Sequence, residues 1–136
     1  MPLSHAVVWM DSKEAHVFRF GAADVESSRI KAHEPFRKVH HKAGAVGNGK
    51  HADDVALFEG VVDALQGVRE WLLVGPGAAK MNFLRYIEKR RRELYRSMVA
   101  IQAMDHPTDR ELLSQARFFF RAFDKLQPNA PARHAA

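Results

Sequence analysis

The sequence predicts an α/β protein in which a mixed sheet carries helices on its faces. Three observations point to this class: the first thirty positions combine a short apolar run with stretches of alternating apolar and polar residues, two further apolar runs follow in the second half, and three stretches place apolar residues at helical spacing. The predicted order is β-β-β-loop-α-β-α-β-α. Strands joined by a tight turn are antiparallel and strands joined through a helix are parallel, so both kinds of pairing are expected in one sheet.

The first three strands are predicted from residue type and alternation. Residues 6–10 are apolar and rich in β-branched and aromatic side chains, and residues 15–20 alternate. The intervening residues 11–14, Asp-Ser-Lys-Glu, are typical of a turn, which favours a hairpin. A third strand is expected over residues 25–32.

A helix and a buried strand are expected in the middle of the chain. Asp53 and Asp54 supply the negative charge that favours a helix N-terminus, and Gly67 is expected to end this helix. Residues 71–74 are apolar without alternation, as in a strand covered on both faces. The chain then enters Gly75-Pro76-Gly77, which predicts a tight turn into the next helix.

The last third continues the alternation of helix and strand. The second helix begins near Ala78 and carries four apolar residues at core spacing, namely Phe83, Ile87, Leu94 and Met98. Residues 99–104 form the next predicted strand, and Asp105 is expected to cap the final helix. The complete order is that of the ribonuclease-H-like architecture, which does not by itself give a function.

Composition limits the classes of protein. A length of 136 residues predicts a single domain, over residues 1–126, with a disordered tail over 127–136. The absence of cysteine excludes thiolate zinc sites and cysteine nucleophiles. No stretch approaches the ~20 apolar residues that span a bilayer, and the first residues lack the pattern of a signal peptide. The expectation is therefore a cytoplasmic protein without a membrane partner.

Positive charge is concentrated in two segments. Of the 21 Lys and Arg residues, six lie within residues 29–51 and seven within residues 80–96. Residues 33–52 are expected to form a long irregular loop, and residues 80–96 a helix whose outer ridge includes Arg85, Lys89, Arg92 and Arg96. Such clusters favour a phosphate backbone as partner. The candidate RNA-binding residues are Arg37, Lys38, His40, His41, Lys42, Asn48, Lys50, His51, Lys80, Arg85, Lys89, Arg90, Arg91, Arg92 and Arg96.

A two-metal nuclease is the first alternative, because its chemistry needs several carboxylates that converge on magnesium. The candidates are Asp11, Glu59, Asp105 and Asp109. A turn role for Asp11 and a capping role for Asp105 explain these residues without a metal, and this structural interpretation is favoured.

Two further motifs also favour structural interpretations. His40, His41 and His51 share one segment, but no carboxylate or cysteine completes a metal-ligand set there. The segment from Gly75 to Lys80 joins a strand to a helix, where an anion is favoured. It departs from the Walker A pattern, because Met81 follows the lysine instead of Ser or Thr. No metal, cofactor or catalytic residue is assigned.

Three stretches resemble the middle domain of the archaeo-eukaryotic class-1 peptide release factors and of Pelota, in particular the short bacterial translational machinery proteins. The opening hairpin is similar in residues 7–11 and 15–18, the Gly-rich turn in residues 72–80, and the last strand-helix junction in residues 105–112. The resemblance covers residues 5–125. It implies a translation-associated module that binds ribosomal RNA or tRNA on the ribosome.

The segment that corresponds to the catalytic loop of release factors departs from the family pattern. Residues 42–51 are glycine-rich and basic but lack Gly-Gly-Gln, and Asn48 lies between Gly47 and Gly49. An amide one methylene shorter is not placed in the same way, so the resemblance does not carry over release activity. Pelota-type middle domains also lack the tripeptide and act in ribosome rescue. The prediction is a non-catalytic module acting in rescue, hibernation or stress, with Gly47, Gly49, Gly75, Pro76 and Gly77 as motif residues.

Two alternatives of other classes stay open. One is a hydrolase, either a peptidyl-tRNA hydrolase that uses the Asn48 loop or a metal-dependent nuclease. The other is a protein-interaction scaffold, because four phenylalanines within six residues spread around a helix and leave at least one exposed. These are Phe118, Phe119, Phe120 and Phe123. The sequence leaves the oligomeric state and a further protein partner undecided.

Overall fold

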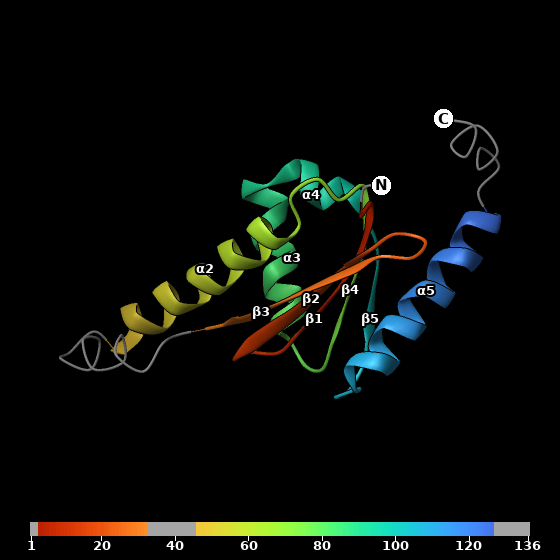
Figure 1. The fold of residues 1–136 in the computed structure, drawn as a ribbon. Helices are drawn as coiled ribbons and strands as arrows, with labels where there is room; N and C mark the ends of the chain where they lie inside the picture. Colours follow the sequence, from red (N-terminus) through yellow and green to blue (C-terminus); the bar gives the residue numbers. More distant parts are fainter. Residues whose placement is uncertain (1–2, 33–45, 127–136) are drawn as a thin grey trace. The chain divides into compact units, whose positions relative to one another are not determined.

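The computed structural model describes residues 3–32 and 46–126. The chain divides into two compact units, residues 1–106 and residues 107–136. The first unit contains the sheet and helices α2, α3 and α4, and the second contains helix α5 (Figure 1). A single domain over residues 1–126 remains a prediction, and the tail predicted over 127–136 lies outside the described residues.

The sheet has five strands in the order β3-β2-β1-β4-β5. β1 (His5–Met10), β2 (Glu14–Phe20) and β3 (Val25–Lys31) are antiparallel neighbours. β4 (Glu70–Gly75) is parallel to β1, and β5 (Met98–Ala103) is parallel to β4. This arrangement confirms the predicted mixed sheet, because each parallel strand follows a helical crossover.

The turn between β1 and β2 shows why the hairpin could be predicted. Oδ1 of Asp11 accepts hydrogen bonds from the backbone N–H groups of Lys13 at 2.8 Å and Glu14 at 3.0 Å. The backbone N–H of Asp11 also donates to the carbonyl of Glu14 at 3.1 Å. The carboxylate thus satisfies the backbone donors of the turn, which is the usual reason for Asp at this position.

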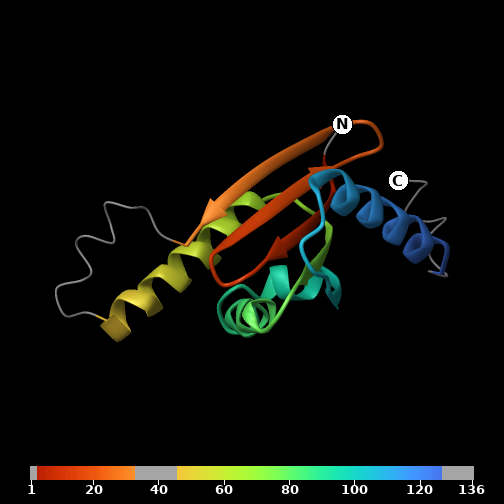
Figure 2. The ribbon, with the colours of Figure 1, turned by 90° about the horizontal axis from the view of Figure 1, so that it is seen from below.

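One buried apolar cluster lies on the face of the sheet where α2 (Val46–Ala64) and α3 (Ala79–Arg90) pack (Figure 2). Alternate residues of β1 and β2 point to this face, and β4 contributes Trp71 and Leu73. Each helix presents apolar residues at helical spacing to the same cluster. The helical side chains include Leu57, Val61, Phe83 and Ile87, and Leu65 joins the cluster from just beyond the end of α2.

Helix α2 begins earlier than the sequence predicted. It starts at Val46, so residues 46–52 of the expected loop are helical, including the Gly47-Asn48-Gly49 motif. Asp53 and Asp54 therefore lie inside the helix, and no acidic residue occupies its first turn. The physical reason is cooperativity: once packing fixes a helical segment, each added residue gains a hydrogen bond without a new nucleation cost.

The predicted second helix is two helices. α3 ends at Arg90, Arg91 adopts φ −140° and ψ 68°, and α4 (Arg92–Ser97) follows. A single continuous helix over residues 79–97 would be about 28 Å long. The six-residue strands β4 and β5 are each about 20 Å long, so such a helix would be longer than the strands it connects. The change of direction at Arg91 instead lets Leu94 and Tyr95 pack against the core.

Helix α5 (Asp109–Leu126) forms the described part of the second unit. Its N-terminus is capped by Thr108, whose Oγ1 accepts from the backbone N–H of Glu111 at 3.1 Å. The Glu111 carboxylate in turn accepts from the N–H of Thr108 at 2.8 Å. The predicted cap at Asp105 is therefore wrong, because this reciprocal pair satisfies the donors three residues later. Phe118 is 67% exposed, as the spread of phenylalanines predicted.

No helix in the described ranges is long and apolar enough to cross a membrane.

Candidate nucleic-acid interface

The structure describes only part of the predicted basic surface. Five candidates, Arg37, Lys38, His40, His41 and Lys42, lie outside the described residues. Asn48, Lys50 and His51 are placed in helix α2 by their backbone. The remaining seven, Lys80, Arg85, Lys89, Arg90, Arg91, Arg92 and Arg96, follow α3 and α4. The described interface is therefore the surface of these two helices, called here the α3–α4 surface.

The α3–α4 surface is not the single helical ridge that the sequence predicted. Arg85 and Lys89 belong to α3, whereas Arg92 and Arg96 belong to α4, beyond the change of direction at Arg91. The four side chains are exposed, but they do not continue one helical row. The prediction of one ridge is wrong because three- and four-residue spacing aligns side chains only while the helix continues.

Arg91 takes part in a cluster that joins α3 to α2. Its guanidinium donates to Oε1 of Glu59 at 2.7 Å, and the hydroxyl of Tyr86 donates to Oε2 of the same carboxylate. The Tyr86 ring packs on Phe58 with ring centroids 5.1 Å apart. Glu59 thus accepts from two residues 27 and 32 positions away along the chain. Arg91 is therefore a structural residue as well as a basic one.

The protonation of these groups follows from their contacts. The hydrogen bond from Tyr86, followed by the nearby Arg91 charge, lowers the pKa of Glu59 below its ordinary value near 4.5. Burial, followed by the carboxylate it contacts, raises the pKa of Tyr86 above 10.0. Glu59 is therefore an anion and Tyr86 neutral at neutral pH, which keeps both hydrogen bonds. Each oxygen of the Glu59 carboxylate therefore accepts one hydrogen bond, from Tyr86 or from Arg91.

Trp71 fixes the position of α4. Its indole N–H lies 3.0 Å from the carbonyl oxygen of Leu94 and 3.1 Å from Oγ of Ser97, and the side chain is fully buried. Because a buried indole N–H needs a partner, the strand β4 and the last turns of α4 are joined at this point. Neither this anchor nor the Glu59 cluster was predicted, since both join residues that no periodicity relates.

The glycines at the start of α3 confirm the tight turn. Gly75 and Gly77 have positive φ angles of 151° and 64°. A Cβ atom on Gly75 would lie 2.1 Å from the carbonyl oxygen of Met10, because β1 and β4 approach closely there. The ammonium of Lys80 donates to the carbonyl of Gly77 at 2.7 Å, which turns the lysine back onto the loop.

A cavity of about 320 Å³ lies at this turn, beside the carboxyl ends of β1 and β4. Its lining includes Asp11, Asp54 and Asn82 as well as the loop residues Pro76 and Gly77. Two carboxylates repel an anion, so the surroundings of this turn oppose the phosphate-binding alternative.

The carboxylates considered for a nuclease have structural partners, and His106 lies 3.8 Å from both Asp11 and Asp105. Oδ1 of Asp11 is engaged by the β1–β2 turn, and Glu59 is engaged by Tyr86 and Arg91. Within the ranges that the structure describes, Asp11, Glu59 and Asp105 do not gather into a group of three ligand atoms. Asp109 belongs to the second unit.

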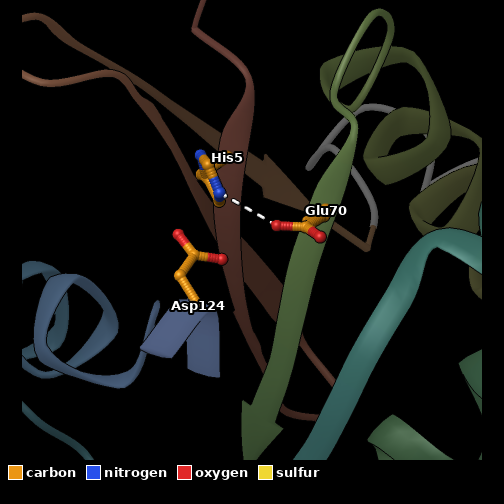
Figure 3. A group of neighbouring side chains, drawn as sticks. All are labelled: His5, Glu70 and Asp124. Atoms are coloured by element: carbon orange, nitrogen blue, oxygen red, sulfur yellow. Dashed lines mark hydrogen bonds and ion pairs between the residues drawn. The ribbon is translucent and has the colours of Figure 1, made fainter. Parts of the chain in front are cut away.

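A histidine-carboxylate pair joins the amino ends of β1 and β4. Nε2 of His5 lies 3.0 Å from Oε1 of Glu70, across two strands that pair in parallel (Figure 3). The figure also draws Asp124, which belongs to the second unit. This pair was not singled out in the sequence, because its members lie 65 residues apart.

Comparison with known proteins identifies the fold. No protein-family model matches the chain, and no curated protein matches its sequence. Among solved structures, Pelota of Archaeoglobus fulgidus is similar over 83% of this chain and 30% of its own, with a TM-score of 0.58 and 14% identity. Pelota of Thermoplasma acidophilum is similar over 82% and 30%, with a TM-score of 0.51 and 20% identity. The archaeal translation termination factor aRF1 is similar over 96% and 41%, with a TM-score of 0.52 and 14% identity.

These likenesses confirm the Pelota-like and release-factor-like fold that the sequence resemblance implied. This chain spans between 30% and 41% of the length of those three proteins.

Proposed function

We propose that this chain is a translation-associated module that binds ribosomal RNA or tRNA on the ribosome. The proposed module is cytoplasmic and has no catalytic step of its own, and its role belongs to rescue, hibernation or stress. The observation that carries the proposal is an exposed basic surface on a fold similar to that of Pelota and of a translation termination factor.

The charge of the α3–α4 surface supports an RNA partner. Between residues 80 and 96 the chain carries seven Lys and Arg residues against Glu88 and Glu93. All but Lys80 among the seven are exposed, and of these six Arg91 is bonded to Glu59, which leaves five exposed cationic groups accessible to phosphates. A phosphate backbone releases bound counterions when such groups approach it, which gives both affinity and salt dependence. Tyr95 and Tyr86 are partly buried against the core, so base stacking on them is a minor contribution.

The proposed lack of catalysis rests on two observations. The chain has no Gly-Gly-Gln, and its nearest segment, Gly47-Asn48-Gly49, lies within helix α2. The carboxylates that a nuclease would use are engaged in a turn and in the Glu59 cluster. Residues 37–51 are proposed as a second RNA contact because they add basic residues before and within the start of α2.

The protein-scaffold alternative has one observation in its favour, the exposure of Phe118. A single exposed apolar side chain is normal in soluble proteins. RNA binding therefore remains the proposed function.

Co-sedimentation with ribosomes tests the proposal. We expect the wild-type protein to pellet with ribosomes at about 50 mM salt and to lose most of its binding at about 200 mM, because each phosphate contact steepens the salt dependence. The double variant Arg85→Glu/Lys89→Glu should weaken binding. Lys13→Glu/Arg69→Glu is the matched control, since it makes the same change of formal charge at exposed positions outside α3 and α4.

Absence of binding at low salt would refute the proposal. Equal weakening in the two double variants would show that net charge alone, and not the α3–α4 surface, is responsible.

A further inference from the structure

The change of direction between α3 and α4 opens a cavity of about 420 Å³ beside the end of α2. This volume lies within the range of pockets that hold small ligands. Apolar side chains from three segments contribute to its lining: Val62 of α2, Leu65 and Val68 of the loop that follows it, and Leu94 of α4. The cavity therefore combines elements that are far apart in the sequence, and only the fold brings them together.

The same cavity carries a concentration of positive charge. Arg90, Arg91 and Arg92 line it, with Glu93 as the one acid among its lining residues in the described part of the chain. Arg90 and Arg92 are exposed, whereas Arg91 is joined to Glu59. Guanidinium groups bind phosphate oxygens in a bidentate manner, so two exposed arginines beside an apolar lining suit an anion that also has an apolar part.

We propose that this cavity binds one nucleotide unit, with the base against the apolar lining and the phosphate at Arg90 and Arg92. Inorganic phosphate alone would leave the apolar lining unfilled, and a purely apolar ligand would leave the arginines unused. A nucleotide uses both, because its base offers a flat apolar face and its phosphate carries the negative charge.

The walls of the cavity are fixed before any ligand binds. The indole of Trp71 joins β4 to Leu94 and Ser97, both of which line the cavity. The bond from Arg91 to Glu59 holds the junction of the two helices against α2. A preformed site loses less conformational freedom on binding and so keeps more of its contact energy as affinity.

This inference deepens the proposed RNA-binding function, since an unstacked nucleotide of a bound RNA is one source of the ligand. A free nucleotide is the other source, and both present the same chemistry to the cavity. The two sources differ in size and in the number of phosphates, so a comparison of probes separates them.

The experiment is a titration of the 136-residue chain, monitored through its amide signals in a nitrogen-15 NMR spectrum. The probes are adenosine 5′-monophosphate, inorganic phosphate and a single-stranded hexamer of oligo(A). We expect adenosine monophosphate to shift the signals of Gly67, Val68 and Leu94 more than phosphate does at equal concentration. Equal shifts with phosphate, or no shifts at these residues, would overturn the proposal.

Two charge-reversal variants locate the site. Arg90→Glu/Arg92→Glu should weaken adenosine monophosphate binding about tenfold or more, because both cationic partners are lost. Lys13→Glu/Arg29→Glu makes the same change of charge at exposed positions outside α3, α4 and the cavity lining, and should bind as the wild type does. Arg91 is left intact because its bond to Glu59 supports the fold, and an unchanged spectrum away from the cavity shows that each variant is folded. Equal weakening by both variants would refute the site.

The probes also assign the source and separate this inference from the proposed function. Tighter binding of the hexamer than of the monophosphate assigns the cavity to RNA, and the reverse assigns it to a free nucleotide. Because neither probe requires ribosomes, the cavity can fail while salt-dependent ribosome binding persists. The opposite result, nucleotide binding without ribosome binding, would remove the proposed function and keep the cavity.

Discussion

The two ends of helix α3 are built in different ways. At its start, Gly75 and Gly77 adopt positive φ angles and Lys80 returns to the carbonyl of Gly77, so neighbouring residues make the turn. At its end, Arg91 leaves the helical conformation within a run of four basic residues that contains no Gly or Pro. No neighbouring residue type requires the helix to end at Arg91. The contacts made there come from other elements: Glu59 of α2 binds Arg91, and Trp71 of β4 binds Leu94.

The difference teaches how to interpret a basic run in a sequence. Arg90, Arg91 and Arg92 are adjacent and equal in charge, but Arg91 binds Glu59 of α2 while its neighbours face solvent beside the cavity. Charge density in the sequence therefore predicts a partner class, whereas the fold determines which of the charges remain available to it.

The largest expected effect concerns the start of α3. Gly75→Ala should destabilise the protein by about 3 kcal/mol or more, because the new methyl group meets the carbonyl of Met10 in a backbone conformation that favours glycine. Gly77→Ala is the matched control: nothing lies within 4 Å of its Cβ position, so only the positive φ costs about 1–2 kcal/mol. Urea unfolding of both variants measures the difference, and equal losses would show that the close approach of β1 and β4 is unimportant.

The second effect concerns the end of α3. Trp71→Phe should lower the free energy of unfolding by about 2 kcal/mol, because Leu94 and Ser97 lose their buried donor. Amide hydrogen exchange in α4 should accelerate by more than the decrease in the global free energy of unfolding accounts for. Trp9→Phe is the control, since it also removes an indole bond, to the carbonyl of Asp105, but at another site. Uniform acceleration in both variants would contradict the role of Trp71 as the anchor of α4.

The smallest effect concerns the Glu59 cluster and depends on pH. Glu59→Gln should cost about 1 kcal/mol at pH 7, as expected for a partly exposed ion pair with one added hydrogen bond. The folded state lowers the pKa of Glu59, so its contribution is complete above the ordinary value near 4.5 and is lost as the pH falls through the lower folded value. The gap between variant and wild type should therefore close in acid.

Urea unfolding at a series of pH values between 2.5 and 7 measures this gap. Glu88→Gln, an exposed change on α3, should show little difference at any of these pH values. A gap for Glu59→Gln that stays constant down to pH 2.5 would exclude the ionised cluster as its cause.

Much of the fold followed from local pattern. Residue type and alternation placed β1, β2 and β3 within one residue of their observed ends, and the Asp11 turn and the Gly75-Pro76-Gly77 turn were predicted from the residues that form them. The start of α2 and the division of α3 from α4 were predicted wrongly. Helix ends are decided by packing and cooperativity when no strong cap or breaker is present.

The sequence by itself determined the fold class, the concentration of basic residues and the glycines at the start of α3. Each of these depends on residues within a few positions of one another, where side-chain type limits the backbone directly. The tertiary structure alone decided that Arg91 is structural, that α4 is held by Trp71, and that three segments enclose a cavity lined by arginines. The bonds of Trp71 to Leu94 and of Arg91 to Glu59 join residues 23 and 32 positions apart, and such contacts exist only after the strands and helices have packed.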